Sequence, residues 1–156
     1  MKFEHVVVVN DPDNPLVPSL SREQLWFGLL CRAEDPTLFL PGLERCEIVE
    51  RHADRLVRRL HFGAAVIDDS VRLAPMESVA FESAATAEHP GGTLTIRIEE
   101  PADTVLVLRF SYQTSLPEDA LDADGAYAGF VRSAYHASDL DTVQVIRSIA
   151  AVGRPQ

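Results

Sequence analysis

The apolar residues of this 156-residue chain recur with a period of two from Glu44 to Tyr112. Alternation of this kind sends successive side chains to opposite faces of a β-strand, so the stretch predicts strands with one buried face. Turn-forming residues interrupt the pattern at short intervals, for example at Gly63 and Ala64 and in the loop Glu88–Gly92. Strands joined by short local turns favour an antiparallel meander, whose apolar face must be covered by other elements.

Other patterns place helices before and after this meander. Ser21 with Gln24 three residues later forms a capping box, which predicts a helix over 22–34. A short helical turn is expected at 38–40, and one long helix from about 118 to 153, where Gly153 ends it. Ser115 and Glu118 form a second expected capping box. The strands are predicted at 2–9, on both sides of the turn 52–54, and at about 65–73, 78–84, 93–99 and 104–113.

This order of elements predicts an α+β fold in a single domain over residues 1–156. A seven-stranded antiparallel sheet has one apolar face that the long C-terminal helix can cover. If the sheet curls around that helix, a void can remain between them, with the short helices closing one end. The chain is 46% hydrophobic, which is enough to build a core of this kind.

The charge balance excludes two classes of partner. The chain has 14 basic and 24 acidic residues and a formal net charge of −10, which argues against binding to nucleic acid or to anionic lipid surfaces. No apolar run approaches the length of a membrane span and none resembles a signal peptide, so we expect a cytoplasmic protein. Cys31 and Cys46 are expected to be reduced thiols. No spacing of histidine, cysteine or carboxylate residues predicts a metal site, and no cofactor fingerprint is present.

Two segments of the chain resemble a known family. They are VVVVNDPDNPLVPSLSREQLWFGLLCRAEDPTLFLPGLERCEIVER near the start and AYHASDLDTVQVIRSI in the last helix. Together with the element order they resemble the AtaL-like family of the SRPBCC (START/Bet v 1-like) superfamily, over essentially the whole chain. The resemblance implies a helix-grip fold with a deep, largely apolar cavity under the C-terminal helix. It implies no particular reaction, because members of the superfamily include lipid carriers, hormone-binding proteins, polyketide cyclases and oxygenase domains.

A two-residue turn at Gly63 and Ala64 would pair Leu60 with Ile67 and Arg58 with Asp69. That face of the hairpin is otherwise apolar, so we expect it to face the cavity. Arg58 and Asp69 can then anchor a carboxylate or carbonyl of a ligand, or they can be an ordinary cross-strand ion pair. A slip of one residue in the register would put Arg59 and Asp68 there instead.

The periodicity of the last helix predicts an inward stripe that includes Phe130, Ala134 and, near its middle, Asp141. A carboxylate on an apolar face must be paired, hydrogen-bonded or protonated, so Asp141 is a candidate partner for Arg58 or a general base. The alternative is that the helix leaves the sheet near Ser138 and exposes Asp141. Asp139 is expected to face solvent.

Further candidates come from the strands and the first helix. Tyr112 shares parity with Leu106, Leu108 and Phe110 and is expected to face inward, with its hydroxyl free to bind a ligand or a backbone group. Trp26, Phe81 and Ile96 are predicted to belong to the core or to the cavity wall. His5 can face inward, and Arg109 is expected at the surface.

Three functional interpretations follow. The favoured one is binding of a small hydrophobic or amphipathic molecule in the cavity. The second is a cyclase or aromatase in which Asp141, Arg58 or Tyr112 transfers protons. The third is an assembly protein with a vestigial cavity. No sequence pattern predicts the oligomeric state, and our expectation is a homodimer.

Overall fold

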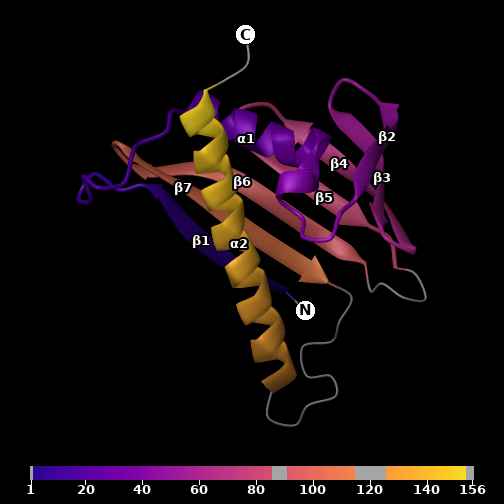
Figure 1. Ribbon diagram of the computed structural model, residues 1–156. Coiled ribbons are helices and arrows are strands. Elements are labelled where there is room, and N and C mark those ends of the chain that lie inside the picture. The colour runs from indigo at the N-terminus through magenta and orange to yellow at the C-terminus, as the bar shows by residue number, and fades with distance from the viewer. Residues whose placement is uncertain (1, 86–90, 115–125, 154–156) are drawn as a thin grey trace.

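The computed structural model describes residues 2–85, 91–114 and 126–153. One seven-stranded antiparallel sheet and two helices make up the fold (Figure 1). In chain order, the elements are β1 (Lys2–Asn10), α1 (Arg22–Glu34), the 3-10 turn η1 (Pro36–Leu38), β2 (Arg45–Arg51), β3 (Arg55–Phe62), β4 (Ala65–Ala74), β5 (Ser78–Ser83), β6 (Gly92–Ala102), β7 (Val105–Thr114) and α2 (Ala126–Val152).

The strands lie in the order β1-β7-β6-β5-β4-β3-β2. Strands β2 to β7 therefore form the meander that the alternating pattern predicts, and β1 joins it beside the last strand. In Figure 1 both helices lie on one face of the sheet, α2 obliquely across β1, β7 and β6, and α1 next to it. This is the helix-grip α+β arrangement that the sequence predicts.

The predicted hairpin register is confirmed. Leu60 pairs with Ile67 and Arg58 with Asp69. Gly63 has φ of +63°, as the first central residue of the turn requires, because a left-handed backbone there favours glycine. The face that carries Arg58 and Leu60 is the inner face of the sheet, toward the helices.

Local sequence signals also set the ends of α1. The Ser21 hydroxyl accepts a hydrogen bond from the Gln24 backbone N–H at 3.0 Å, and the Ser21 backbone N–H donates to the Gln24 side chain at 2.8 Å. The capping box is therefore formed as predicted. The helix ends at Glu34, ahead of Pro36, and the short helical turn that follows begins two residues earlier than expected.

The end of one strand differs clearly from the sequence expectation. Strand β6 continues to Ala102, whereas the sequence predicts a loop after Glu99. The register shifts between Glu99 and Ala102, so Pro101 lies in an irregular part of the ladder, where its missing N–H is tolerated. The described part of the last helix begins at Ala126. The predicted start near Glu118 and its capping box with Ser115 lie outside the described residues. Gly153 ends the helix with φ of +96°, as predicted.

The two helices contact each other closely at Gly28. A Cβ atom at this position would lie 2.6 Å from Cγ2 of Ile146, so only glycine allows the helices this separation. Ile146 is fully buried and belongs to the core between α1, α2 and the sheet. This contact sets how closely the middle of α1 approaches α2.

Candidate functional site

A cavity of about 250 Å³ lies between the inner face of the sheet and the two helices. Most of its wall comes from inward-facing residues of strands β3 to β7, and α1 and α2 contribute Arg32 and Tyr135. The lining residues are Arg32, Leu40, Arg58, Leu60, Phe62, Ile67, Asp69, Phe81, Ser83, Gly92, Thr93, Leu94, Tyr112, Thr114 and Tyr135. An internal volume of this size accommodates a ligand of about one or two aromatic rings.

The predicted pair Arg58 and Asp69 lies in the cavity wall and is buried. Nε of Arg58 donates to Oδ1 of Asp69 at 2.8 Å, and Nη2 donates to Oδ2 at 2.5 Å. Nη1 donates to the backbone carbonyls of Arg32 and Ala33, at 3.1 and 3.0 Å. These carbonyls belong to the last turn of α1, where unpaired C=O groups need donors and the helix dipole favours a cation. Arg58 therefore joins the end of α1 to strands β3 and β4.

Arg32 also lines the cavity, and the sequence analysis missed it. Its side chain is buried, and its guanidinium carbon lies 4.7 Å from the centroid of the Phe81 ring. Its Nε has no hydrogen-bond partner among the described residues. Burial lowers the pKa of Arg32 to about 10, so the group stays charged at neutral pH. An arginine in the last turn of an amphipathic helix ordinarily faces solvent, so its sequence position gave no signal of burial.

Tyr112 is inward-facing, as predicted. Its hydroxyl, expected to be free for a ligand or a backbone group, is instead part of a buried chain of hydrogen bonds between side chains. The hydroxyl donates to Oδ1 of Asp139, and Nδ1 of His5 lies 2.7 Å from Oδ2 of the same carboxylate. The Tyr112 ring packs against Phe3 and Tyr135, at centroid distances of 5.0 and 4.4 Å, and those two rings also contact each other at 5.4 Å. Three elements that are far apart in the sequence, β1, β7 and α2, supply this chain.

Burial shifts the pKa values of two groups in this chain of hydrogen bonds, Asp139 and Tyr112. It raises the pKa of Asp139, an effect that the hydrogen bonds from Tyr112 and His5 oppose. Burial, together with the neighbouring Asp139 carboxylate, also raises the pKa of the Tyr112 hydroxyl well above its usual range. The tyrosine is therefore a hydrogen-bond donor at neutral pH. The carboxylate holds its proton more strongly than an exposed aspartate does.

The prediction for the last helix is wrong in its phase. Asp141 is exposed, whereas Asp139, expected to face solvent, is 1% exposed. The buried residues of α2 include Asp139, Thr142, Val143 and Ile146, a stripe rotated by about 100°, one residue, from the predicted one. The shift has a physical reason. The buried stripe contains two polar residues, which a hydrophobic pattern assigns to the water side, and Asp139 is tolerated there because distant partners satisfy it.

The remaining candidates divide between cavity and core. Leu60 and Phe81 line the cavity. Trp26 and Ile96 are buried in the core cluster and do not line the cavity. Ala134 is exposed, which contradicts its prediction, because it lies on the same outward side of α2 as Asp141. The side chain of Phe130 lies outside the described residues. Arg109 pairs with Glu99 and Glu4 on the outer face of the sheet, as expected for a surface residue.

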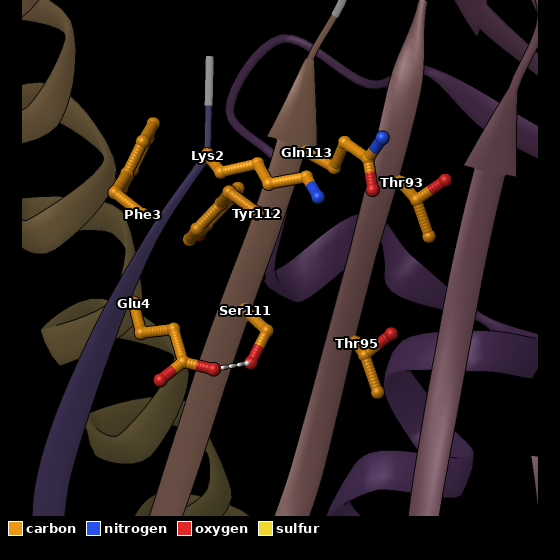
Figure 2. A pocket seen from close by; sticks show the side chains of 8 residues that line it. All are labelled: Lys2, Phe3, Glu4, Thr93, Thr95, Ser111, Tyr112 and Gln113. Atoms are coloured by element: carbon orange, nitrogen blue, oxygen red, sulfur yellow. Dashed lines mark hydrogen bonds between the residues drawn. The ribbon is translucent and has the colours of Figure 1, made fainter.

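Hollows also lie outside the interior, two of them of about 480 and 540 Å³. One, of about 480 Å³, lies over the outer face of β1, β7 and β6. Polar side chains such as Glu4 and Thr95 gather there (Figure 2). The Ser111 hydroxyl donates to Glu4 there at 2.8 Å (Figure 2). The other is an apolar groove of about 540 Å³ between α1 and the end of α2, which includes Phe27 and Ile149. Two buried arginines, Arg32 and Arg58, line the interior cavity and neither of these two hollows.

Within residues 2–85, 91–114 and 126–153, no group of three or more His, Cys, Asp or Glu side chains is arranged to hold a metal ion. In the same part of the chain, no helix has the length and apolar character needed to cross a membrane. Cys31 and Cys46 are free thiols, each partly buried.

A curved antiparallel sheet that holds a long C-terminal helix over an internal cavity defines the class of SRPBCC, or START/Bet v 1-like, proteins. The family of AtaL, described as acetylaranotin biosynthesis cluster protein L, matches residues 7–153. The chain belongs to this family. No curated protein matches the sequence.

Solved structures with this fold include proteins of several kinds. The aromatase/cyclase ZhuI from Streptomyces sp. R1128 is 23% identical, with a TM-score of 0.59 and 99% of each chain covered. The di-domain aromatase/cyclase StfQ of the steffimycin biosynthetic pathway has a TM-score of 0.71 at 13% identity, over 96% of this chain and 50% of that one. Human STARD10 has a TM-score of 0.63 at 9% identity, over 96% of this chain and 64% of the STARD10 chain. At these identities the similarity shows the shared fold.

Proposed function

We propose that this chain binds a small, largely apolar molecule in the cavity between the sheet and the two helices. The observation that carries the proposal is the composition of the cavity wall. Apolar side chains such as Leu60, Phe81 and Leu94 form its body, and a few buried charged side chains line it, among them Arg32 and Arg58. A mostly apolar enclosure with a small number of placed polar groups is typical of ligand sites.

Native mass spectrometry of the purified protein tests this proposal directly. We expect a bound species of a few hundred daltons or less, which is lost when the protein is denatured. If nothing is bound after purification, titration with naphthalene derivatives measures whether the cavity takes up an apolar ring system.

A pair of variants on β6 assigns such binding to the interior. Leu94 lines the cavity, whereas its neighbour Thr95 lines the hollow on the outer face of the sheet. Leu94→Trp fills the cavity and should abolish binding, and Thr95→Trp should leave it unchanged. The opposite result would move the site to the outer face, and binding that neither variant affects would contradict both locations.

A second candidate function is catalysis of the aromatase or cyclase kind. The observation that favours it is the chain from Tyr112 to Asp139 and His5, in which a buried carboxyl of raised pKa is linked through a tyrosine hydroxyl to the cavity. Such a group can accept a proton from carbon next to a carbonyl and return it to the oxygen that becomes a hydroxyl when a carbon–carbon bond closes. The structural similarity to aromatase/cyclases adds support at the level of fold.

Tyr112→Phe separates this candidate from simple binding. With a synthetic poly-β-ketone thioester as substrate, the variant should lose most of the cyclisation rate while its affinity for the substrate changes little. An absence of turnover by the wild-type protein, alongside tight binding, would leave binding as the function.

A further inference from the structure

The guanidinium of Arg32 is a buried cation without a counter-ion in contact among the described residues. Its side chain is 7% exposed, and it lines the cavity. Its Nε has no hydrogen-bond partner, and no ion pair or side-chain hydrogen bond joins it to another residue in the described part of the chain. A buried charge with no partner is costly, so this arrangement needs a compensating interaction.

The carboxylates near Arg32 already have other hydrogen-bond partners. Both oxygens of Asp69 accept hydrogen bonds from Arg58, and both oxygens of Asp139 are in contact with Tyr112 or His5. These carboxylates act on Arg32 only through longer-range attraction. The aromatic face of Phe81 lies under Arg32, but it lies under Arg58 as well, at 5.2 Å from the guanidinium carbon.

Arg32 is not needed to complete the end of α1 either. The helix dipole favours a cation at this end, and Nη1 of Arg58 already donates to the carbonyls of Arg32 and Ala33. Arg58 thus supplies the cation and the donors that a helix C-terminus requires. The charge of Arg32, which lines the cavity, is therefore not needed at the helix end.

We infer that the ligand of this cavity is a monoanion, a compact apolar molecule with one carboxylate that Arg32 binds. The inference rests on the proposed binding function and adds the chemical class of the ligand. Of the described residues that line the cavity, Arg32, Arg58 and Asp69 carry charge, and Asp69 neutralises Arg58. One positive charge is left, which a single carboxylate matches, and the planar guanidinium suits a carboxylate in two-point contact.

The test compares two probes that differ in charge and hardly in shape, 2-naphthoate and its neutral amide, 2-naphthamide. Isothermal titration calorimetry at pH 7.5 measures the affinity of the whole chain for each probe. We expect the wild-type protein to prefer 2-naphthoate by about tenfold or more, because a charge-assisted hydrogen bond forms away from water. In Arg32→Met this preference should disappear, while the affinity for 2-naphthamide stays within about threefold.

Arg59→Met is the matched control, since it removes the same charge from the exposed face of β3, where Arg59 pairs with Asp68. It should keep the full preference for the anion. Arg32→Gln, which loses the charge but keeps a polar side chain, replaces Arg32→Met if the latter does not fold, and the same loss is expected.

The outcomes distinguish the two proposals. Equal binding of both probes by the wild-type protein overturns the assignment of a monoanion and leaves the cavity as a site for neutral ligands. A preference that persists in the Arg32 variants also overturns it, because another group then binds the anion. Failure of both probes to bind overturns this inference together with the proposed function on which it rests.

Discussion

Three buried charged groups around the cavity differ in how they are satisfied. Arg58 is held by Asp69 and by two helix carbonyls, Asp139 is held by Tyr112 and His5, and Arg32 has only the Phe81 ring among the described residues. Burial of a charge is tolerated in proportion to the partners that replace water. The first two groups therefore serve the fold as well as the site. Arg32 has no counter-charge in contact among the described residues, which is why we infer an anionic ligand.

Substitution of Arg58 should be far more harmful than substitution of its neighbour Arg59. Arg58→Met leaves Asp69 buried and unpaired, and it leaves two helix carbonyls without a donor, so we expect a loss of about 3–5 kcal/mol in the free energy of unfolding. Arg59→Met breaks an exposed pair and should leave the free energy of unfolding almost unchanged. Urea denaturation monitored by circular dichroism measures both. Similar losses would show that the Arg58 contacts do not stabilise the fold.

The buried carboxyl of Asp139 predicts a particular pH dependence. Because its pKa is raised in the folded state, the contribution of Asp139 to stability is fully present below the unfolded pKa of about 3.9 and is lost as the pH rises through the folded value. Asp139→Asn does not titrate. The free energy of unfolding of the wild-type protein should therefore fall relative to this variant as the pH is raised from about 4.

Denaturation of both proteins at a series of pH values measures the difference between their free energies of unfolding. The other carboxylates are present in both proteins, so their contributions cancel in this difference. Those on the outer face behave oppositely, since hydrogen bonds from His61 and Arg109 lower the pKa values of Glu47 and Glu99. A difference that rises with pH would mean that the folded state stabilises the ionised form of Asp139.

At the level of elements, the position of α1 decides where the cavity ends. The helix carries Arg32 in its last turn, is held by Arg58, and touches α2 at Gly28. The sequence identified this helix and its capping box from local signals. It gave no indication that its C-terminal arginine points inward, because that depends on which strands lie opposite.

Two glycine-to-alanine substitutions test the close contact between the helices. Gly28→Ala would place a methyl group 2.6 Å from Ile146, which is fully buried, and we expect a net loss of about 1–2 kcal/mol. Gly129 in α2 is exposed, and a Cβ atom there would meet no described atom within 4 Å, so Gly129→Ala should instead gain about 0.5–1 kcal/mol from helix propensity. Thermal unfolding of both variants provides the comparison, and stabilisation by both would contradict the close contact.

At the scale of the molecule, the acidic surface and the interior site have opposite characters. The chain has a formal net charge of −10. The described residues that line the cavity, in contrast, have a net charge of one positive unit. A net charge of this size supports solubility and does not determine what an enclosed site binds. The ligand class follows from the few charges inside.

Ligand binding should stabilise the whole molecule by mass action. At a concentration of 100 times its Kd, a ligand such as 2-naphthoate adds about 2.7 kcal/mol, which corresponds to a rise in Tm of about 5–10 °C for a domain of this size. Differential scanning fluorimetry with and without the ligand measures the shift, which dialysis should reverse. A Tm that does not depend on ligand concentration would contradict binding to the folded state.

The sequence by itself determined the features that depend on near neighbours along the chain. The alternation of residues predicted the strands, Gly63 predicted the hairpin and with it the pairing of Arg58 with Asp69, and Ser21 with Gln24 predicted the start of α1. Only the tertiary structure decided the phase of α2 and the states of Asp139 and Arg32. Whether a charged side chain can be buried depends on the groups it meets, and for Asp139 these come from His5 and Tyr112, 134 and 27 residues away. Periodicity cannot report such partners, because it scores each residue by its own polarity.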